Sequence, residues 1–479
     1  MFVNQIFSIV VAVSAAAVIH AKNIYVAADG SDSNSGLSQG VPFATIGKAV
    51  SESADGDFIF VDNGSYSVTE TVIVNKNVSV VGVSGNPEDV IIQPPAGVNT
   101  AVGYRLLNVT AAGAVVSGLT VQNGGFGENA PASNVTDPTK SGANLYVSAG
   151  TVSNCVLRNA KVTSPLNNEL YHSPGVVLNG ANALLTDSVV CGNINAQGNP
   201  LVPGGGIWSV SGRIVRCQIY GNKSRSLGGG IACQDNESTI IQDCVISNNV
   251  SGSIDTSYVG GQGWCCGGGG VFRGTLVNCL IIENIVTDSR QGQYYYGGGA
   301  YGGSGLLAST AYNCTVASNK NVSIAKNGKL SVSAVRGDVA IKNNNVKYDS
   351  GVLPCTLYNT ISYDNFECTA NNFATVNETS TSNNIFGVVM INSCTDAANM
   401  TNALTGSENN VAGDPLFITV KGFPYAIGKE SPCFGNGRAS LIPVSLGVHA
   451  DILGYPRSNS RGNIGCFEGR SPATILIVR

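Results

Sequence analysis

Asn278-Cys-Leu-Ile-Ile-Glu-Asn284 and Asn313-Cys-Thr-Val-Ala-Ser-Asn319 are two copies of a short segment that recurs along the chain. The second residues of the copies are 155, 188, 217, 244, 279, 314 and 360, so the spacings are 33, 29, 27, 35, 35 and 46 residues. A glycine run followed by an apolar residue precedes most copies, as in residues 228–231, 267–271 and 297–300. Self-similarity at such a period indicates a solenoid, in which each repeat forms one structural unit.

Each repeat contains two or three short runs in which apolar and polar residues alternate, which is the pattern of a β-strand. Glycine and asparagine lie between the runs, and both residues tolerate the positive φ angle of a sharp turn. Helical spacing is absent from the repeats. The unit therefore predicts one coil of a parallel β-helix, an all-β solenoid whose coils stack about 4.8 Å apart.

Stacking of the coils predicts columns of equivalent side chains. The expected inward column of thiols consists of Cys155, Cys217, Cys244, Cys279 and Cys314. The expected turn column of hydrogen-bonded amides consists of Asn222, Asn249, Asn284 and Asn319. Buried cysteine behaves as a small hydrophobe, so inert thiols are expected, with bridges between neighbouring coils as the alternative. The cysteines outside the column, which are better candidates for disulfides, are Cys355, Cys368, Cys394, Cys433 and Cys466.

The composition excludes several classes of protein. The 479 residues include 26 Lys plus Arg and 30 Asp plus Glu, which gives a formal charge of −4. A charge-poor, slightly acidic chain is not expected to bind nucleic acid, because that requires clustered basic residues. Apolar residues make up 43% of the chain, which excludes a disordered protein.

The N-terminus predicts export. Residues 6–19 are almost all apolar and are followed by Ala21, so we expect a signal peptide over residues 1–21. This stretch is shorter than the roughly 20 residues that span a bilayer, although a retained anchor is the alternative. We expect no transmembrane segment in the mature chain, which is predicted to be secreted or held at the cell surface.

Three groups of motifs carry a resemblance to a known family. Ile24-Tyr-Val-Ala-Ala-Asp-Gly-Ser-Asp-Ser-Asn-Ser-Gly36 and Pro42-Phe-Ala-Thr-Ile46 resemble the opening of secreted right-handed β-helix proteins of the pectate-lyase-like superfamily. The Asn-Cys-x-Ile-x-x-Asn units are similar to repeats of the polymorphic outer-membrane type. Asp414-Pro-Leu-Phe417, Ser431-Pro-Cys433 and Asn463-Ile-Gly-Cys-Phe-Glu468 are similar to the choice-of-anchor domain that closes many such proteins.

The resemblance implies a right-handed coil with a short capping helix over residues 45–53 and an irregular C-terminal cap. The expected organisation is a signal peptide (1–21), an N-terminal cap (22–60), the β-helix (61–405) and an anchor-like C-terminal region (406–479). The resemblance implies no activity, because the fold hosts lyases, hydrolases and adhesins alike.

Acidic residues supply few candidates for catalysis or metal binding. Lyases of this fold hold calcium with clustered carboxylates, but Asp187 and Asp243 are separated by the coil of Arg216 and should lie about 10 Å apart. An acidic loop at residues 29–34 would suit calcium, although an Asx turn is the alternative. No metal site or other cofactor is predicted. The weak catalytic candidates lie in long loops and are Asp255, Asp288 and Arg290.

Aromatic residues give a stronger signal. The residues that follow the inward apolar residue of the glycine-led strand should point outward, and four of them are Tyr146, Trp208, Phe272 and Tyr301. Loops at residues 250–266 and 285–296 add further rings, namely Trp264, Tyr294, Tyr295 and Tyr296. Flat rings with polar rims suit sugar stacking or a protein partner. The alternative is a ladder of rings that covers and stiffens the sheet.

Two functions follow from these observations. The preferred one is a non-catalytic secreted or surface β-helix that binds a polysaccharide or surface glycan, binds a protein, or assembles with itself. The alternative is an extracellular polysaccharide lyase or glycoside hydrolase that acts on an acidic polysaccharide. A cluster of Asp255, Asp288 and Arg290 in one groove would favour the enzyme, and their separation on loop tips would favour binding.

Overall fold

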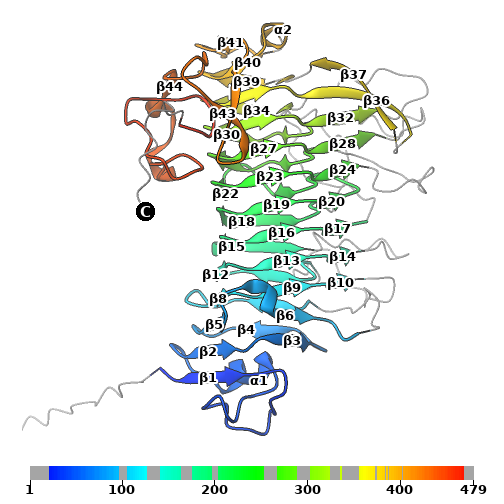
Figure 1. Cartoon of the computed structure of the whole chain (residues 1–479), viewed down its shortest axis with the longest axis vertical. Helices are drawn as coiled ribbons and strands as arrows, with labels where there is room; N and C mark the ends of the chain where they lie inside the picture. Colours follow the sequence, from blue (N-terminus) through cyan, green and yellow to red (C-terminus); the bar gives the residue numbers. More distant parts are fainter. Residues whose placement is uncertain are drawn as a thin grey trace, which may run out of the picture.

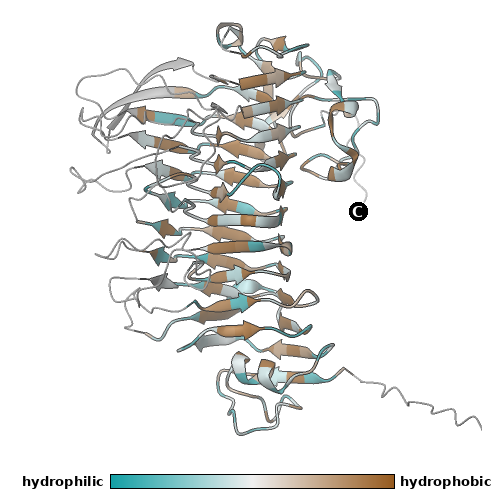
Figure 2. Cartoon of the chain, turned by 180° about the vertical axis from the view of Figure 1, so that it is seen from behind, coloured by the Kyte–Doolittle hydropathy of each residue, from teal (hydrophilic) through white to brown (hydrophobic). Residues whose placement is uncertain are grey.

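The chain folds into a right-handed parallel β-helix, as predicted (Figure 1). The computed structural model describes residues 21–96, 105–126, 141–162, 175–196, 203–252, 267–288, 303–323, 335–336, 355–372, 375–382, 385–386, 388–401 and 403–468. Within these residues, three long sheets of 20, 12 and 9 strands run along the solenoid. Strands rich in apolar residues are stacked along its length (Figure 2).

One coil shows how the repeat builds the fold. Strands β26 (Thr275–Val277), β27 (Leu280–Ile282) and β28 (Ile285–Asp288) follow one another around the coil. The next coil continues in register 35 residues later, because Leu280 pairs with Thr315 in β31 (Thr315–Ala317). The repeat length of the sequence is therefore the length of one coil.

A column of left-handed residues forms one corner of the solenoid, which we call the corner column. Its φ angles lie between 46° and 54°. Asparagine and aspartate adopt this conformation more readily than other side chains, because their short polar groups can hydrogen-bond locally. The members of the corner column are Asn154, Asp187, Arg216, Asp243, Asn278, Asn313, Asn359 and Asn392.

The predicted thiol column is confirmed as part of the interior. All five of its cysteines are at most 2% exposed and belong to the main apolar core. Cys217 N donates to Cys244 Sγ at 3.4 Å, and in other coils a hydroxyl takes the same place, as where Cys155 N donates to Ser188 Oγ at 3.1 Å. Burial raises the pKa of Cys155 to about 12, so this thiol is protonated and unreactive at neutral pH.

The predicted asparagine ladder is also confirmed. Asn222 Nδ2 donates to Asn249 Oδ1, Asn249 Nδ2 to Asn284 Oδ1, and Asn284 Nδ2 to Asn319 Oδ1, each at 3.0 Å. Each oxygen also accepts the main-chain N–H of the preceding asparagine, as Asn249 Oδ1 does from Asn222 N at 3.0 Å. These amides are fully buried, and the ladder satisfies polar groups that would otherwise destabilise the interior.

A short helix packs on the first strands, as predicted. Helix α1 (Ile46–Glu52) has Thr45 as its N-cap and contacts β1 (Asn23–Val26), β2 (Phe58–Val61) and β4 (Val72–Val74). Strand β1 pairs in parallel with β2, so the ladder already begins within the segment expected to form the cap.

The acidic loop before α1 has a structural role. Asp32 Oδ1 accepts hydrogen bonds from Ala44 N and Thr45 N, both at 2.9 Å, and Asp32 Oδ2 accepts one from Thr45 Oγ1 at 2.8 Å. Across the described parts of the chain, no group of three or more His, Cys, Asp or Glu side chains is arranged to hold a metal ion.

Residues 417–468 turn back along the side of the last coils, and we call them the folded-back segment (Figure 1). The segment contains two antiparallel pairs, β42 (Phe417–Val420) with β43 (Phe423–Ile427), and β44 (Gly437–Arg438) with β45 (Arg461–Gly462). Its apolar residues pack on the outer face of the 12-stranded sheet, in clusters that include Leu280 and Ile361.

The helices within the described ranges are short. None of them is long and apolar enough to cross a membrane.

Candidate functional site at the folded-back segment

The folded-back segment is held by amides of the corner column. Asn278 Nδ2 donates to Ala450 O at 2.5 Å, and Asn359 Nδ2 donates to Arg438 O at 2.9 Å. Asn392 Nδ2 donates to Asn436 O at 2.6 Å. The same side-chain position in three coils therefore binds main-chain carbonyls of the segment.

Asn313 lies between Asn278 and Asn359 in the corner column but has no such partner. Its side chain is 1% exposed, and its Nδ2 finds no acceptor among the described residues. A buried N–H group without an acceptor costs about 1–3 kcal/mol. Asn313 lines a cavity between the column and the folded-back segment, where Ala450 and Arg438 serve its neighbours instead.

The cavity has a volume of about 150 Å³. At about 30 Å³ per water molecule, this is room for about five waters. Asn313 and Asn359 form the wall on the β-helix side, and residues 437–449 and 457–468 contribute the opposite wall. The space suits one small polar group, such as a carboxylate with part of the ring that carries it.

A second unpaired amide comes from the opposite wall. Asn463 Oδ1 accepts a hydrogen bond from Gly435 N at 2.7 Å, which fixes the orientation of this amide. Its Nδ2 is buried and has no acceptor among the described residues. Two asparagines from different parts of the chain thus line one cavity, and the Nδ2 of each is buried without an acceptor among the described residues.

A largely buried ion pair between Arg457 and Glu468 contributes to the lining of the cavity. The Arg457 and Glu468 side chains are 6% and 14% exposed, and Arg457 Nη1 lies 2.8 Å from Glu468 Oε1. Arg457 also donates through Nε to Asn278 Oδ1 at 3.1 Å. Burial raises the pKa of Glu468 even though the guanidinium of Arg457 favours its charged form.

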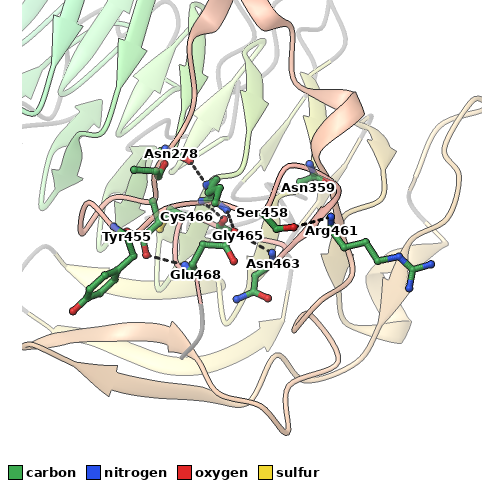
Figure 3. Close-up of polar contacts among 12 residues, drawn as sticks. Asn278, Asn359, Tyr455, Ser458, Arg461, Asn463, Gly465, Cys466 and Glu468 are labelled. Atoms are coloured by element: carbon green, nitrogen blue, oxygen red, sulfur yellow. Dashed lines mark hydrogen bonds and ion pairs between the residues drawn. The ribbon is translucent and has the colours of Figure 1, made fainter. Parts of the chain in front are cut away.

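Donors outnumber acids among the polar side chains of the cavity, which also has an apolar wall formed by Ile442, Pro443, Val444 and Val448. Arg438 and His449 line it together with Arg457 and the two unpaired amides, and Glu468 is the acid among the lining side chains. Figure 3 shows Asn278 and Asn359 approaching from the β-helix, with Asn463 and Glu468 on the other side. This arrangement suits a ligand that is rich in acceptors, above all a carboxylate.

The predicted aromatic column forms a stack, but its rings are buried. Tyr146 pairs with Val177, Val177 with Trp208, and Trp208 with Ala232, which pairs with Phe272. Tyr146, Trp208 and Phe272 are 8%, 8% and 1% exposed, and they belong to an apolar cluster separate from the main core. This agrees with a ladder of rings that covers the sheet, and their role as a ligand platform stays a prediction.

Basic side chains lie on two of these rings. The Arg105 guanidinium lies 4.3 Å from the Tyr146 ring centre, and that of Arg273 lies 5.0 Å from the Phe272 ring centre. A sugar that stacked on these rings would have to displace the two guanidinium groups.

The predicted alignment of the glycine-led strand in the coil after Phe272 is wrong. The sequence pattern placed Ala300 inward and Tyr301 outward after the glycine run at 297–299, but Val271 pairs with Leu306 and Phe272 with Leu307. The described residues Gly303, Ser304 and Gly305 lead the strand instead, so Leu307 occupies the outward position expected for Tyr301.

Most of the predicted loop residues lie outside the described ranges. These are Asp255, Trp264, Arg290, Tyr294, Tyr295, Tyr296 and Tyr301. Asp288 ends β28, where its backbone pairs with Ser323. Clustering of the catalytic candidates Asp255, Asp288 and Arg290 therefore stays a prediction.

Asp187 and Asp243 flank Arg216 in the corner column, as predicted. Arg216 Nε lies 2.6 Å from Asp187 Oδ1, and this hydrogen bond lowers the pKa of Asp187. Asp243 accepts a hydrogen bond from Asn278 at 3.1 Å, and burial raises its pKa. Both carboxylates are engaged in structural contacts of the corner.

Sequence reasoning missed the cavity. The bond from Asn278 to Ala450 joins residues 172 positions apart, and that from Asn359 to Arg438 joins residues 79 positions apart. No local pattern reports such contacts. The available signal was the asparagine that recurs directly before the residue of the thiol column or its equivalent, at positions 278, 313 and 359.

Comparisons with known proteins find similar solved structures at low sequence identity. No protein-family model and no curated protein matches the sequence. A crystal structure of the pectate lyase Pel9A aligns with a TM-score of 0.51 and 14% identity over 95% of this chain and 98% of the lyase chain. XylC in complex with xylose aligns with a TM-score of 0.46 and 10% identity over 93% and 98% of the two chains. A pectin methylesterase from Aspergillus niger aligns with a TM-score of 0.33 and 16% identity over 67% and 91%.

The chain is thus a protein of the right-handed parallel β-helix class. At 14% identity, its likeness to a pectate lyase shows this fold alone.

Proposed function

We propose that this chain is an extracellular β-helix protein that binds an acidic glycan and holds a sugar carboxylate in the cavity beside the folded-back segment. One observation carries the proposal: Asn313 and Asn463 both line this cavity, and each has a buried amide Nδ2 without an acceptor. A carboxylate offers two oxygens and about four acceptor sites, which is enough to accept from both amides once their side chains turn toward it.

Charge and size support the same ligand class. Arg438 and His449 add donors to the cavity wall, and a charge-assisted hydrogen bond to a carboxylate is roughly twice as strong as a neutral one. The volume of about 150 Å³ admits one sugar unit at most, so a chain end or a side group is a better ligand than an internal stretch. Because a lyase named for pectate shares the fold, a uronate is the first sugar to test.

The test is a titration of the purified chain with galacturonate oligosaccharides, followed by calorimetry. Asn313→Asp keeps the shape of the side chain and its preference for the left-handed backbone but replaces the donor with a negative charge. We expect affinity to fall at least about tenfold, because one hydrogen bond to a charged group is worth about 1.5–3 kcal/mol. Asn154→Asp makes the same change in the same column, far from the cavity, and should leave binding unchanged.

Neutral oligosaccharides provide the specificity control. Equal affinity for neutral and acidic sugars, or equal binding by the Asn313→Asp and native proteins, would contradict the carboxylate site.

An enzyme is the second candidate, because burial raises the pKa of Glu468, which lines the cavity together with His449. Incubation with polygalacturonate, read by ultraviolet absorbance of unsaturated uronates and by reducing ends, separates the two functions. Product formation that is lost in Glu468→Gln would identify a lyase or hydrolase centred on the cavity. Product that persists would direct attention to Asp255, Asp288 and Arg290.

A further inference from the structure

Cys394 holds an unusual place among the cysteines of the β-helix. It begins β40 (Cys394–Thr395) in one of the last coils, where it pairs with Ile361. Ser393, the residue before it, donates to Leu357 O at 3.2 Å and accepts from Thr360 N at 3.1 Å, as members of the thiol column do. Since side chains alternate along a strand, Cys394 faces outward, toward the folded-back segment.

The folded-back segment places a second cysteine against this one. Cys433 N donates to Ser431 Oγ at 3.1 Å, and Cys433 O accepts from Ile464 N at 3.0 Å, so its backbone is held on both sides. Cys394 and Cys433 are both 0% exposed and belong to one apolar cluster with Ile361 and Ile464. Both are free thiols in the structure, and Cys394 Sγ donates to Gly413 O at 3.6 Å.

The thiols of the interior column differ from this pair. They stack at one position of successive coils, and a hydroxyl can take the same position. Ser188 and Thr360 show this, because their hydroxyl oxygens accept from Cys155 N and Cys314 N. Cys355, which the sequence placed among the candidates for disulfides, lies in the main core and donates to Ser309 O at 2.9 Å. Cys394 and Cys433 instead join two parts of the chain that have no sequence repeat in common.

We propose that Cys394 and Cys433 form a disulfide that ties the folded-back segment to the end of the β-helix. The two thiols lose two protons and two electrons as the S–S bond forms, and the electrons pass to a disulfide oxidant, which becomes two thiols. Such exchange takes place in the oxidising compartments through which exported proteins pass.

The bond would also support the cavity. β44 begins at Gly437, four residues after Cys433, and contains Arg438 of the cavity wall. The inference does not depend on the identity of the ligand, because the bond is detected by mass and not by binding.

The first test maps the bond chemically. The full chain is equilibrated with oxidised glutathione, denatured without reductant, alkylated with iodoacetamide and digested. We expect one linked peptide pair that contains Cys394 and Cys433, with Cys155, Cys217 and Cys279 alkylated. Alkylation of both Cys394 and Cys433, or a bond from either one to another cysteine, would overturn the proposal.

A second test uses the only basic residues between the two cysteines, Lys421 and Lys429. Trypsin that cuts at either lysine leaves the C-terminal fragment attached to the β-helix on a non-reducing denaturing gel, and reduction releases it. Cys433→Ser should release the fragment with or without reductant. Cys155→Ser, which installs the residue found at position 188 of the next coil, is the matched control and should behave like the native chain. Release of the native fragment without reductant after oxidation would refute the bond.

Discussion

Asn359 and Arg438, 79 residues apart, exchange two hydrogen bonds, from Asn359 Nδ2 to Arg438 O at 2.9 Å and from Arg438 N to Asn359 Oδ1 at 3.0 Å. One coil earlier, Asn313 Nδ2 has no acceptor within the described structure. The amide that anchors the folded-back segment in one coil therefore lacks an acceptor in the coil before, which is the basis of the proposed ligand site.

Replacement of Asn359 by glycine should loosen the folded-back segment. Glycine adopts the left-handed backbone of the corner, where φ is 48°, so the variant removes only the side-chain bonds. We expect the free energy of unfolding to fall by about 1–3 kcal/mol, measured by urea denaturation. Asn154→Gly changes the same corner far from the segment, and it should lower the free energy of unfolding by less. An equal loss in both variants would show that the anchor contributes nothing.

Acidification should favour the native chain relative to Glu468→Gln. Burial raises the pKa of Glu468 in the folded state, so the folded state binds more protons than the unfolded state between the two pKa values. Burial of the charged carboxylate therefore destabilises the folded state. This loss of stability is fully present above the folded pKa and disappears as pH falls through the folded pKa toward the unfolded value. Urea denaturation at pH 7 and at about pH 4, just below the usual pKa of a glutamate, should show the native chain gaining stability relative to the variant. A pH-independent difference would contradict this.

Removal of one asparagine from the ladder should be costly. Asn249→Ala deprives Asn222 N and Asn222 Nδ2 of a shared acceptor, each 3.0 Å away. We expect a loss of at least about 2 kcal/mol in the free energy of unfolding, because one donor is left with no partner in the interior. Asn248→Gly, which alters the adjacent exposed corner, is the control and should cost less. Thermal denaturation followed by circular dichroism would rank the two.

The thiol column should accept a hydroxyl but reject an alkyl group. Cys244 Sγ accepts from Cys217 N at 3.4 Å, and serine or threonine fills this role in other coils. Cys244→Ser should therefore be more stable than Cys244→Val, by about 1–3 kcal/mol, although valine is the more apolar residue. The opposite order in urea denaturation would mean that the column is held by apolar packing alone.

The sequence was sufficient for the repeating part of the molecule. Columns such as Cys155 to Cys314 and Asn222 to Asn319 follow from a period of about 30 residues, since equivalent residues must stack when coils pair in register. The capping helix followed from a recognisable opening motif, with Thr45 as its N-cap.

The candidate site could not be predicted in the same way. Its contacts join corner residues such as Asn313 to residues more than 100 positions later, and only the turn of residues 417–468 brings them together. The aromatic column was located, but whether its rings face solvent depends on what covers them, which alternation does not reveal. Tyr301 was misplaced because two glycine runs follow one another and only one of them leads the strand.

The parallel ladder has a consequence for the length of the molecule. Within the described sheets, the main-chain ladder pairs each coil with the coil before and the coil after. The folded-back segment packs on outer-face residues from Val245 onward in the 12-stranded sheet. Whole turns could be deleted or duplicated between Val90 and Cys191 without changing any wall of the cavity. The number of early coils therefore determines the distance between the cavity and the N-terminal end of the β-helix.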